Sequence, residues 1–441
     1  MGEALPELGA VFWPVGTGDS STVVVSDQTV VQIDLHDMVK ADDEDTHEVP
    51  VVDLLVEALP KGADGRPYLA VFLLTHADKD HCSGFADLLD RVTIGQLWAT
   101  PRLWREYADP DAPEPCKDAQ AFQEEAERRV RATKDAIASG TEPVSGDRIL
   151  VVGYDTDHDK HAYSELGDAY LATPGRSVTM LDGKDFAGRF EAFIHAPFKA
   201  DCAEARNETS LSVQVTLTED GGQDGKLLLF GDLAHDTIMK IFDYSEYWKR
   251  EQYLEWDLLL APHHCSKKVM YTRQDGKDVL QDDVLEAFER HARDGAVIIA
   301  SSGPVPDTDT DGKNPPHRMA ADRYREIVDA GNFICTMEWP SEQDPVPVTF
   351  GVDADGARIV RVDVVELSVR SLAEKAAAAG PRRRLAAVAA AASRAGSIAA
   401  ARSGTTARKA ETRSGPDRVQ DAIAANRGGQ PSAAPVGFGR A

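Results

Sequence analysis

Short apolar runs separated by polar turns recur along the first 365 residues, and they have two different periods. STVVVS at residues 21–26 and YLAVFLLT at residues 68–75 have the length and the β-branched content of buried strands. VPVVDLLVEAL at residues 49–59 has apolar positions at helical spacing, and the charged, glycine-free segment 117–139 is typical of an exposed helix. This alternation predicts an α/β fold built on sheets.

The same pattern continues to the end of this region. Apolar runs that end in polar residues predict further strands at residues 10–15, 29–34, 189–197, 210–217, 226–232, 256–264 and 295–303. A helix is expected over residues 317–330, a closing hairpin over residues 346–365, and a proline- and aspartate-rich loop over residues 109–115. We therefore expect one folded domain over residues 1–365.

The composition changes after Val365. Residues 366–441 are rich in alanine, arginine, serine and glycine, and they hold few large apolar side chains that could anchor a helix in a core. This segment has 13 basic and 5 acidic residues, a net charge of +8, so the chain's total of −26 leaves −34 on the first 365 residues. We expect a flexible or partly helical basic tail of low complexity over residues 366–441.

This charge difference limits the partners of each region. A domain this acidic repels polyanions, which argues against indiscriminate nucleic-acid binding by residues 1–365. The tail is either a solubility or linker segment or an electrostatic arm for nucleic acid or an acidic partner. Five cysteines argue against a disulfide framework, and the sequence has no secretion signal and no apolar run of membrane-spanning length. These features favour a cytoplasmic protein without a membrane partner.

The stretch LLTHADKDHCSG, residues 73–84, places two histidines and two aspartates directly after an apolar strand. Other expected strands also end in residues of these types. The strand-end residues are Asp34, His76, Asp78, Asp80, His81, His195, Asp232, His263 and His264. Because polar groups at successive strand ends converge on one rim of an α/β fold, this set predicts a metal site rather than a solvated acidic loop.

The residue types suit two divalent cations. Neutral imidazoles bind Zn or Mn, and carboxylates add charge and favour harder ions such as Mg. Within the turn, His76 and Asp78 can face one ion while Asp80 and His81 face its neighbour, and Asp232 can bridge the two.

Other strand-end residues have supporting roles in this interpretation. His195 and His264 would complete the two shells, and Asp34 would orient a ligand or the loop. Either His263 or His264 binds the metal; we favour His264 as the ligand, with His263 facing the substrate.

Several segments together resemble the metallo-β-lactamase superfamily. They are VGTGDSSTVVV at residues 15–25, LLTHADKDHCSGF at 73–85, RNETSLSVQVTL at 206–217, LLLFGD at 227–232 and LLLAPHHCSKK at 258–268. The chain is most similar there to the hydrolase domain attached to the ComEC-type DNA-uptake channel and to its free-standing relatives. This resemblance covers roughly residues 9–350 and implies an αββα metallo-β-lactamase sandwich.

The resemblance also implies roles for individual residues. The implied metal shell comprises His76, Asp78, Asp80, His81, Asp232 and one of His263 and His264, while His195 matches the third superfamily motif loosely. Asp80 and Asp232 would hold a bridging hydroxide as the nucleophile, and His263 would donate a proton to the leaving group. Residues expected to support the shell or to contact the substrate are Asp34, Asn207, Ser210, Lys267 and His317.

The implied activity is metal-dependent hydrolysis with two divalent cations, Zn or Mn, or Mg. The subfamily implies a phosphodiester, so we expect a phosphodiesterase or nuclease acting on nucleic acid or a nucleotide. Two alternatives stay open. One is a hydrolase of lactone, thioester or amide bonds on the same metals, and the other is a non-catalytic assembly module of a defence or stress system.

Overall fold

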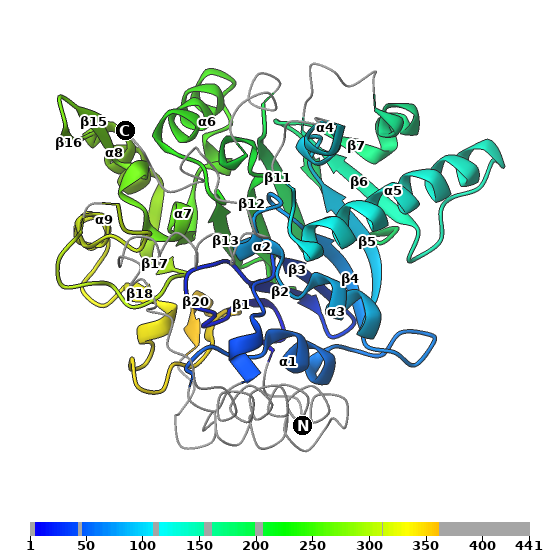
Figure 1. Ribbon diagram of the computed structural model, residues 1–441, viewed down its shortest axis with the longest axis horizontal. Helices are drawn as coiled ribbons and strands as arrows, with labels where there is room; N and C mark the ends of the chain where they lie inside the picture. The colour runs from blue at the N-terminus through cyan, green and yellow to red at the C-terminus, as the bar shows by residue number, and fades with distance from the viewer. Residues whose placement is uncertain are drawn as a thin grey trace, which may run out of the picture. The chain divides into compact units, whose positions relative to one another are not determined.

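The computed structural model describes residues 5–42, 46–108, 114–153, 161–198, 206–310 and 312–360. Two large sheets form its centre (Figure 1). The first sheet has the strand order β20 (Gly356–Val360), β19 (Val348–Asp353), β1 (Gly9–Phe12), β2 (Ser21–Ser26), β3 (Thr29–Ile33), β4 (Tyr68–Leu73), β5 (Thr93–Ala99), β6 (Arg148–Val152) and β7 (Leu171–Ala172). The second has the order β18 (Phe333–Cys335), β17 (Ala292–Ala300), β14 (Trp256–Leu260), β13 (Asp224–Leu229), β12 (Ser212–Thr218), β11 (Phe190–Ala196) and β8 (Ser177–Val178).

Both sheets contain a parallel block. Strands β3, β4, β5 and β6 run parallel in the first sheet, and β13, β14, β17 and β18 run parallel in the second. Two short hairpins lie outside the sheets, β9 (Met180–Leu181) with β10 (Lys184–Asp185) and β15 (Tyr271–Gln274) with β16 (Lys277–Leu280). Since polar residues follow the carboxyl ends of parallel strands, each sheet contributes one edge to a common site.

Helices cover the outer faces of the sheets. The helices are α1 (Val51–Ala58), α2 (Lys79–Cys82), α3 (Phe85–Arg91), α4 (Arg102–Ala108), α5 (Lys117–Ala138), α6 (His235–Tyr247), α7 (Pro262–Cys265), α8 (Asp282–His291) and α9 (Arg318–Tyr324). In Figure 1, α3, α4 and α5 lie on the side of β4, β5 and β6, whereas α6, α8 and α9 lie on the side of β17 and β18. The αββα sandwich that the sequence predicts is confirmed.

Aromatic side chains attach the helices to the sheets. Phe72 of β4 lies with its ring centroid 4.9 Å from Phe85 of α3 and 5.9 Å from Phe122 of α5. Phe242 of α6 and Phe288 of α8 are 5.8 Å apart on the outer face of the second sheet. The inner faces of the two sheets share one apolar core, which leaves their polar strand ends at its rim.

The elements agree with the sequence in part. The predicted helix over residues 117–139 is present as α5, but it is amphipathic and buries a face that includes Phe122 and Ala126. The helix predicted over 317–330 ends at Tyr324, because the chain then turns into β18. Strand β5 and helix α6 were not predicted. In β5, Gly95 and Gln96 interrupt the apolar run. Gln96 accepts a hydrogen bond from the backbone of Asp182, a partner far along the chain.

Two further expectations concern the ends and the surroundings of the fold. The tail over residues 366–441 and the end of the predicted hairpin lie outside the described residues, which stop at Val360. Within the described part of the chain, no helix has the length and apolar character needed to span a bilayer.

Candidate metal centre

The carboxylate of Asp34, directly after β3, holds the loop that follows β4. Its Oδ1 accepts a hydrogen bond from the backbone N–H of Thr75 at 2.7 Å, and its Oδ2 accepts one from the Thr75 hydroxyl at 2.6 Å. Oδ2 also lies 2.7 Å from Nδ1 of His81. Such a contact fixes the imidazole and leaves its Nε2 for a ligand. Asp34 therefore holds both the loop after β4 and the ring of His81.

A close approach of two turns brings Asp19 into the centre. The backbone N–H of Asp19 donates to the carbonyl of Asp80 in α2 at 3.0 Å. Gly18 permits this approach, since a Cβ there would lie 1.8 Å from Nδ1 of His36 and 2.7 Å from the carbonyl oxygen of Asp80. As a result Oδ1 of Asp19 lies 3.4 Å from Nδ1 of His264.

The second sheet supplies Asp232 after β13. Gly231 precedes it with a φ of 57°, and a Cβ at Gly231 would lie 2.9 Å from Ser210 Cβ. The Ser210 hydroxyl accepts a hydrogen bond from the Asp232 N–H at 3.2 Å, and the Asn207 side-chain amide donates to Asp232 Oδ2 at 3.1 Å. Ser210 Oγ also lies 3.3 Å from Nδ1 of His76. Asn207 and Ser210 thus contact residues of the centre directly.

The histidine pair after β14 is presented by an unusual backbone. His263, His264 and Cys265 have φ values of 51°, 54° and 65°, all in the left-handed region. His264 Nδ1 lies 3.1 Å from the carbonyl oxygen of Ser301, which follows β17. This run of left-handed residues turns both imidazoles towards Asp232.

One group of ligand-type atoms is tightly clustered. Atoms of Asp19, His81, Asp232 and His264 all lie within 4.8 Å of one another, and all four residues are buried. Asp80 joins them through Oδ2, which lies 3.6 Å from His264 Nε2. We call these five residues the His81 half of the centre.

A second group lies on the other side of Asp232. His76 Nε2 is 3.7 Å from Asp78 Oδ2 and 3.8 Å from Asp232 Oδ2, and His263 Nε2 is 3.6 Å from the same Asp232 oxygen. We call His76, Asp78, His263 and Asp232 the His76 half. His76 Nε2 is buried without a hydrogen-bond partner while it faces two carboxylates, an arrangement that a cation would satisfy.

Asp232 belongs to both halves through different oxygens. Its Oδ1 lies 3.2 Å from His81 Nε2 and 3.4 Å from His264 Nε2, whereas its Oδ2 faces His76 and His263. A carboxylate with each oxygen turned towards a separate pair of imidazoles is the arrangement expected of a bridging ligand.

The electrostatics favour a cation. Burial disfavours a charged imidazole at His81 and His264, yet nearby carboxylates, Asp232 above all, raise the pKa of both well above the usual value. Burial opposes ionisation of Asp232, but the surrounding histidines hold its pKa well below the usual value. His263 differs, since burial lowers its pKa to about 4 and keeps it neutral near pH 7. Excess negative charge in the His81 half is thus balanced by protons that a metal ion can displace.

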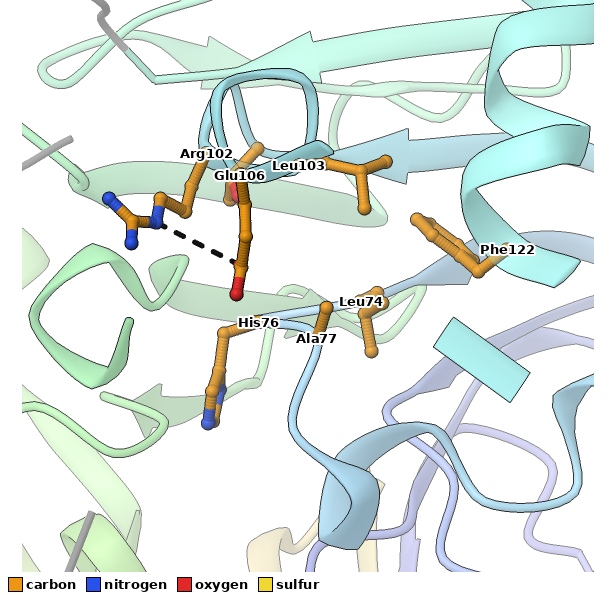
Figure 2. A pocket seen from close by; sticks show the side chains of 8 residues that line it. Leu74, His76, Ala77, Arg102, Leu103, Glu106 and Phe122 are labelled. Atoms are coloured by element: carbon orange, nitrogen blue, oxygen red, sulfur yellow. Dashed lines mark ion pairs between the residues drawn. The ribbon is translucent and has the colours of Figure 1, made fainter. Parts of the chain in front are cut away.

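An ion-pair network borders the His76 half. A pocket beside His76 is lined by Leu74, His76, Ala77, Thr100, Arg102, Leu103, Glu106 and Phe122. Figure 2 shows the Glu106 side chain extending from α4 towards His76, with Arg102 on one side. Arg206 pairs with both Glu106 and Asp78.

Three predicted site residues are not joined to the cluster. His195 is buried, and its Nε2 lies 2.9 Å from the carbonyl oxygen of Tyr253. The Lys267 ammonium pairs with Asp278 of β16 at 2.6 Å. His317 caps α9, and its Nδ1 accepts a hydrogen bond from the Lys267 N–H at 3.3 Å. Within the described residues, no hydrogen bond or ion pair links these three side chains to either half.

Two residues of the site were missed in the sequence. Asp19 stands in a glycine-rich segment, and its place before the buried strand β2 was a usable signal. Arg206 stands next to Asn207, but its partners Glu106 and Asp78 lie about a hundred or more positions earlier in the chain, so no local pattern marks it.

Comparisons with known proteins give little guidance. No protein-family profile and no curated protein matches this chain. Among solved structures, the chain is similar to the metallo-β-lactamase MIM-1 from Novosphingobium pentaromativorans, with 18% identity, 59% of this chain and 77% of that protein covered, and a TM-score of 0.28. The interpretation of the site therefore depends on the residues of this chain.

Proposed function

We propose that this chain is a metal-dependent hydrolase that holds two divalent cations, one in each half of the centre. The observation that carries the proposal is Asp232, whose two oxygens face separate pairs of buried imidazoles. A structural histidine cluster has no need of so many carboxylates, since buried charges are costly unless they are paired or bind metal.

The donors divide between the cations as follows. His81, His264, Asp19 and Asp80 would hold the first, and His76 and Asp78 the second, with Asp232 shared. Bound cations of this kind act as Lewis acids and lower the pKa of water at the site. The mixture of imidazole and carboxylate suits Zn or Mn, and the identity of the metal is left to measurement.

The chain's own residues supply the remaining chemistry. Asn207 and Ser210 orient Asp232 and His76 through the hydrogen bonds described above. His263 Nε2 lies 3.6 Å from Asp232 Oδ2. Because burial lowers the pKa of His263 to about 4, its imidazole is neutral near pH 7, and we assign it to a hydrogen bond with the leaving group or with a developing oxyanion.

A phosphodiester is the proposed substrate class, with a nucleic acid or a nucleotide as its source. Two cations suit in-line displacement at phosphorus, and the likeness of the motifs to ComEC-type domains points the same way. Lactone or thioester hydrolysis is the second candidate. The apolar side chains of Leu74, Leu103 and Phe122 beside His76 favour it, because they would suit an acyl group.

The test compares wild type with the double variant Asp80→Ala/His81→Ala. Both are assayed on bis-p-nitrophenyl phosphate, single- and double-stranded DNA, and a lactone and thioester panel, and metal content is measured on the same samples. We expect phosphodiester cleavage that depends on added Mn or Zn and is lost in the variant. His235→Ala, a histidine of α6 outside the centre, is the matched control.

The other outcomes are equally informative. Bound metal with cleavage of lactones or thioesters alone would replace the phosphodiester assignment with the second candidate. A wild-type protein that binds no divalent cation would reject the hydrolase and leave an assembly role.

A further inference from the structure

Arg206 is the one guanidinium, among the described residues, that contacts a carboxylate of the centre. It pairs with Asp78 Oδ1 through Nη1 and with Glu106 through Nη2, and its Nε donates to Glu106 Oε2 at 3.0 Å. Glu106 is itself buried, with 7% of its surface exposed, so it holds the guanidinium in place from behind. The other oxygen of Asp78, Oδ2, is the one that faces His76.

The two halves therefore differ in charge. The His81 half contains Asp19 and Asp80 in addition to the shared Asp232, and within the described residues no arginine or lysine forms an ion pair with Asp19 or Asp80. The His76 half has Asp78 as its own carboxylate, and that charge is paired with Arg206. A cation in the His76 half would meet one carboxylate fewer than a cation in the His81 half, and the guanidinium held between Glu106 and Asp78 is bonded to one of its ligands.

We propose that Arg206 is a positioning residue that makes the two cation sites unequal, so that the His76 half holds its ion more weakly than the His81 half. This inference rests on the proposed function. It also changes what Asp78 implies, since an aspartate at that position would by itself strengthen the binding of a cation. With Arg206 bound to it, Asp78 contributes an oxygen atom with little net charge.

The effect has a definite sign. Two positive charges within several ångströms repel by a few kcal/mol even at an effective dielectric of about 20, enough for at least a tenfold loss of affinity. The orienting effect of Arg206 on Asp78 acts in the opposite direction. Because Asp78 Oδ2 already faces His76 from a short loop, we expect the charge effect to exceed the orienting effect.

Titration of metal-free protein with Mn²⁺, with free Mn²⁺ followed by electron paramagnetic resonance, tests this. Wild type should bind two ions with dissociation constants at least about tenfold apart. Arg206→Met should tighten the weaker ion about tenfold and leave the tighter one unchanged. Arg206→Lys keeps the charge but not the fork geometry, and it should keep the gap.

Controls separate this role from folding. Among the described residues, Arg206→Met leaves Arg102, at 3.9 Å, as the one cation beside the buried Glu106. The pair Arg206→Gln/Glu106→Gln therefore removes both charges and keeps a hydrogen bond. Because the Glu106 charge is lost as well, this pair should tighten the weaker ion less than Arg206→Met does, with an unchanged circular dichroism spectrum. Arg102→Met, which removes a guanidinium that contacts Glu106 but not Asp78, should change neither constant.

Several results would overturn the inference. Two ions of equal affinity in wild type and in Arg206→Met would do so, as would weaker binding of the second ion in both Arg206→Met and the Gln/Gln pair. These results would leave the proposed function intact. Absence of any Mn²⁺ or Zn²⁺ binding in wild type would remove both proposals together.

Discussion

The loop after β4, residues 74–84, and the loop after β14, residues 261–266, each present a pair of histidines to the centre. In the first, the carboxylate of Asp34 grips Thr75 and His81 from the neighbouring strand, and α2 continues in regular helix. In the second, the backbone itself makes the turn, with three successive residues in the left-handed region. One loop is held by side chains of the same sheet, and the other by its own main chain.

Because the two loops are held differently, they should be sensitive to different substitutions. The first loop depends on a buried carboxylate, so loss of one hydrogen-bonding group should release a ligand. The second depends on conformations that L-residues adopt at a cost, so its sensitivity lies in the choice of residue at each position rather than in a distant partner.

The largest effect is expected where the loops meet. Asp232→Ala removes the carboxylate that both histidine pairs face, so both ions and hydrolysis should be lost by well over a hundredfold, beyond the range found for partners that only touch a ligand. Metal analysis and bis-p-nitrophenyl phosphate turnover check this. Two ions retained at full affinity would show that Asp232 is not shared between the sites.

His195, near the end of β11, tests whether a third segment belongs to the comparison. Burial lowers the pKa of His195 to about 4, against 6.5 in an unfolded chain, so this residue favours folding above pH 6.5 and the benefit is lost as the pH falls towards 4. The loss at pH 4 is about 3 kcal/mol. Urea unfolding of metal-free wild type and His195→Gln at pH 7 and pH 4 measures it.

A flatter pH dependence in metal-free His195→Gln is the expected result, and a separate Mn²⁺ titration of this variant should still give two bound ions. Loss of one ion from His195→Gln would instead make His195 a ligand, as the sequence first indicated. An acid dependence identical to that of wild type would mean that His195 is not buried as described.

Asp34→Asn should weaken the first loop and leave the second unchanged. Its amide can still accept from Thr75, but it loses the charged contact with His81 Nδ1. Affinity for the ion of the His81 half should fall about 10–100-fold, the range for partners of metal-bound histidines. Mn²⁺ titration measures the change, and Thr75→Val, which removes one hydroxyl, serves as a milder comparison. An unaltered affinity would contradict the role of Asp34.

The smallest expected effect concerns the cysteines that follow His81 and His264. Cys265 has a φ of 65°, so Cys265→Gly should be more stable than Cys265→Ala by about 1 kcal/mol. Cys82 ends the helix α2, so there the order should reverse and Gly should be less stable by about 1 kcal/mol. Thermal unfolding of the four variants decides. The same order of stability for the Gly and Ala variants at both positions would contradict the difference in backbone conformation between the loops.

The sequence predicts the first loop better than the second for a physical reason. His76, Asp78, Asp80 and His81 lie within six positions, so their joint role is visible as one motif. The strand-end rule also singles out Asp232 and the histidine pair, since each follows a parallel strand, and the structure brings these residues close to His76 and His81.

What the sequence could not supply depends on contacts between distant segments. In the sequence, Asp19 cannot be distinguished from any other aspartate in a turn. Its place in the centre depends on the close approach of Gly18 to α2. His195 lies near the end of β11, where the sequence suggested a ligand, but its Nε2 contacts the carbonyl oxygen of Tyr253. Lys267 follows the histidine pair closely, yet its ammonium group forms an ion pair with Asp278 of the adjacent hairpin. Position along a strand predicts the neighbourhood of a side chain, whereas its partner is set by tertiary packing.

The shared position of Asp232 has a consequence for how long the protein stays folded. Residues 19, 81, 232 and 264 are far apart in an unfolded chain, so an ion that needs all of them binds only after both sheets have formed. Such an ion binds late in folding, so it should slow unfolding more than it speeds folding. We expect chelation to shorten the protein's half-life at elevated temperature well before it changes the rate of refolding.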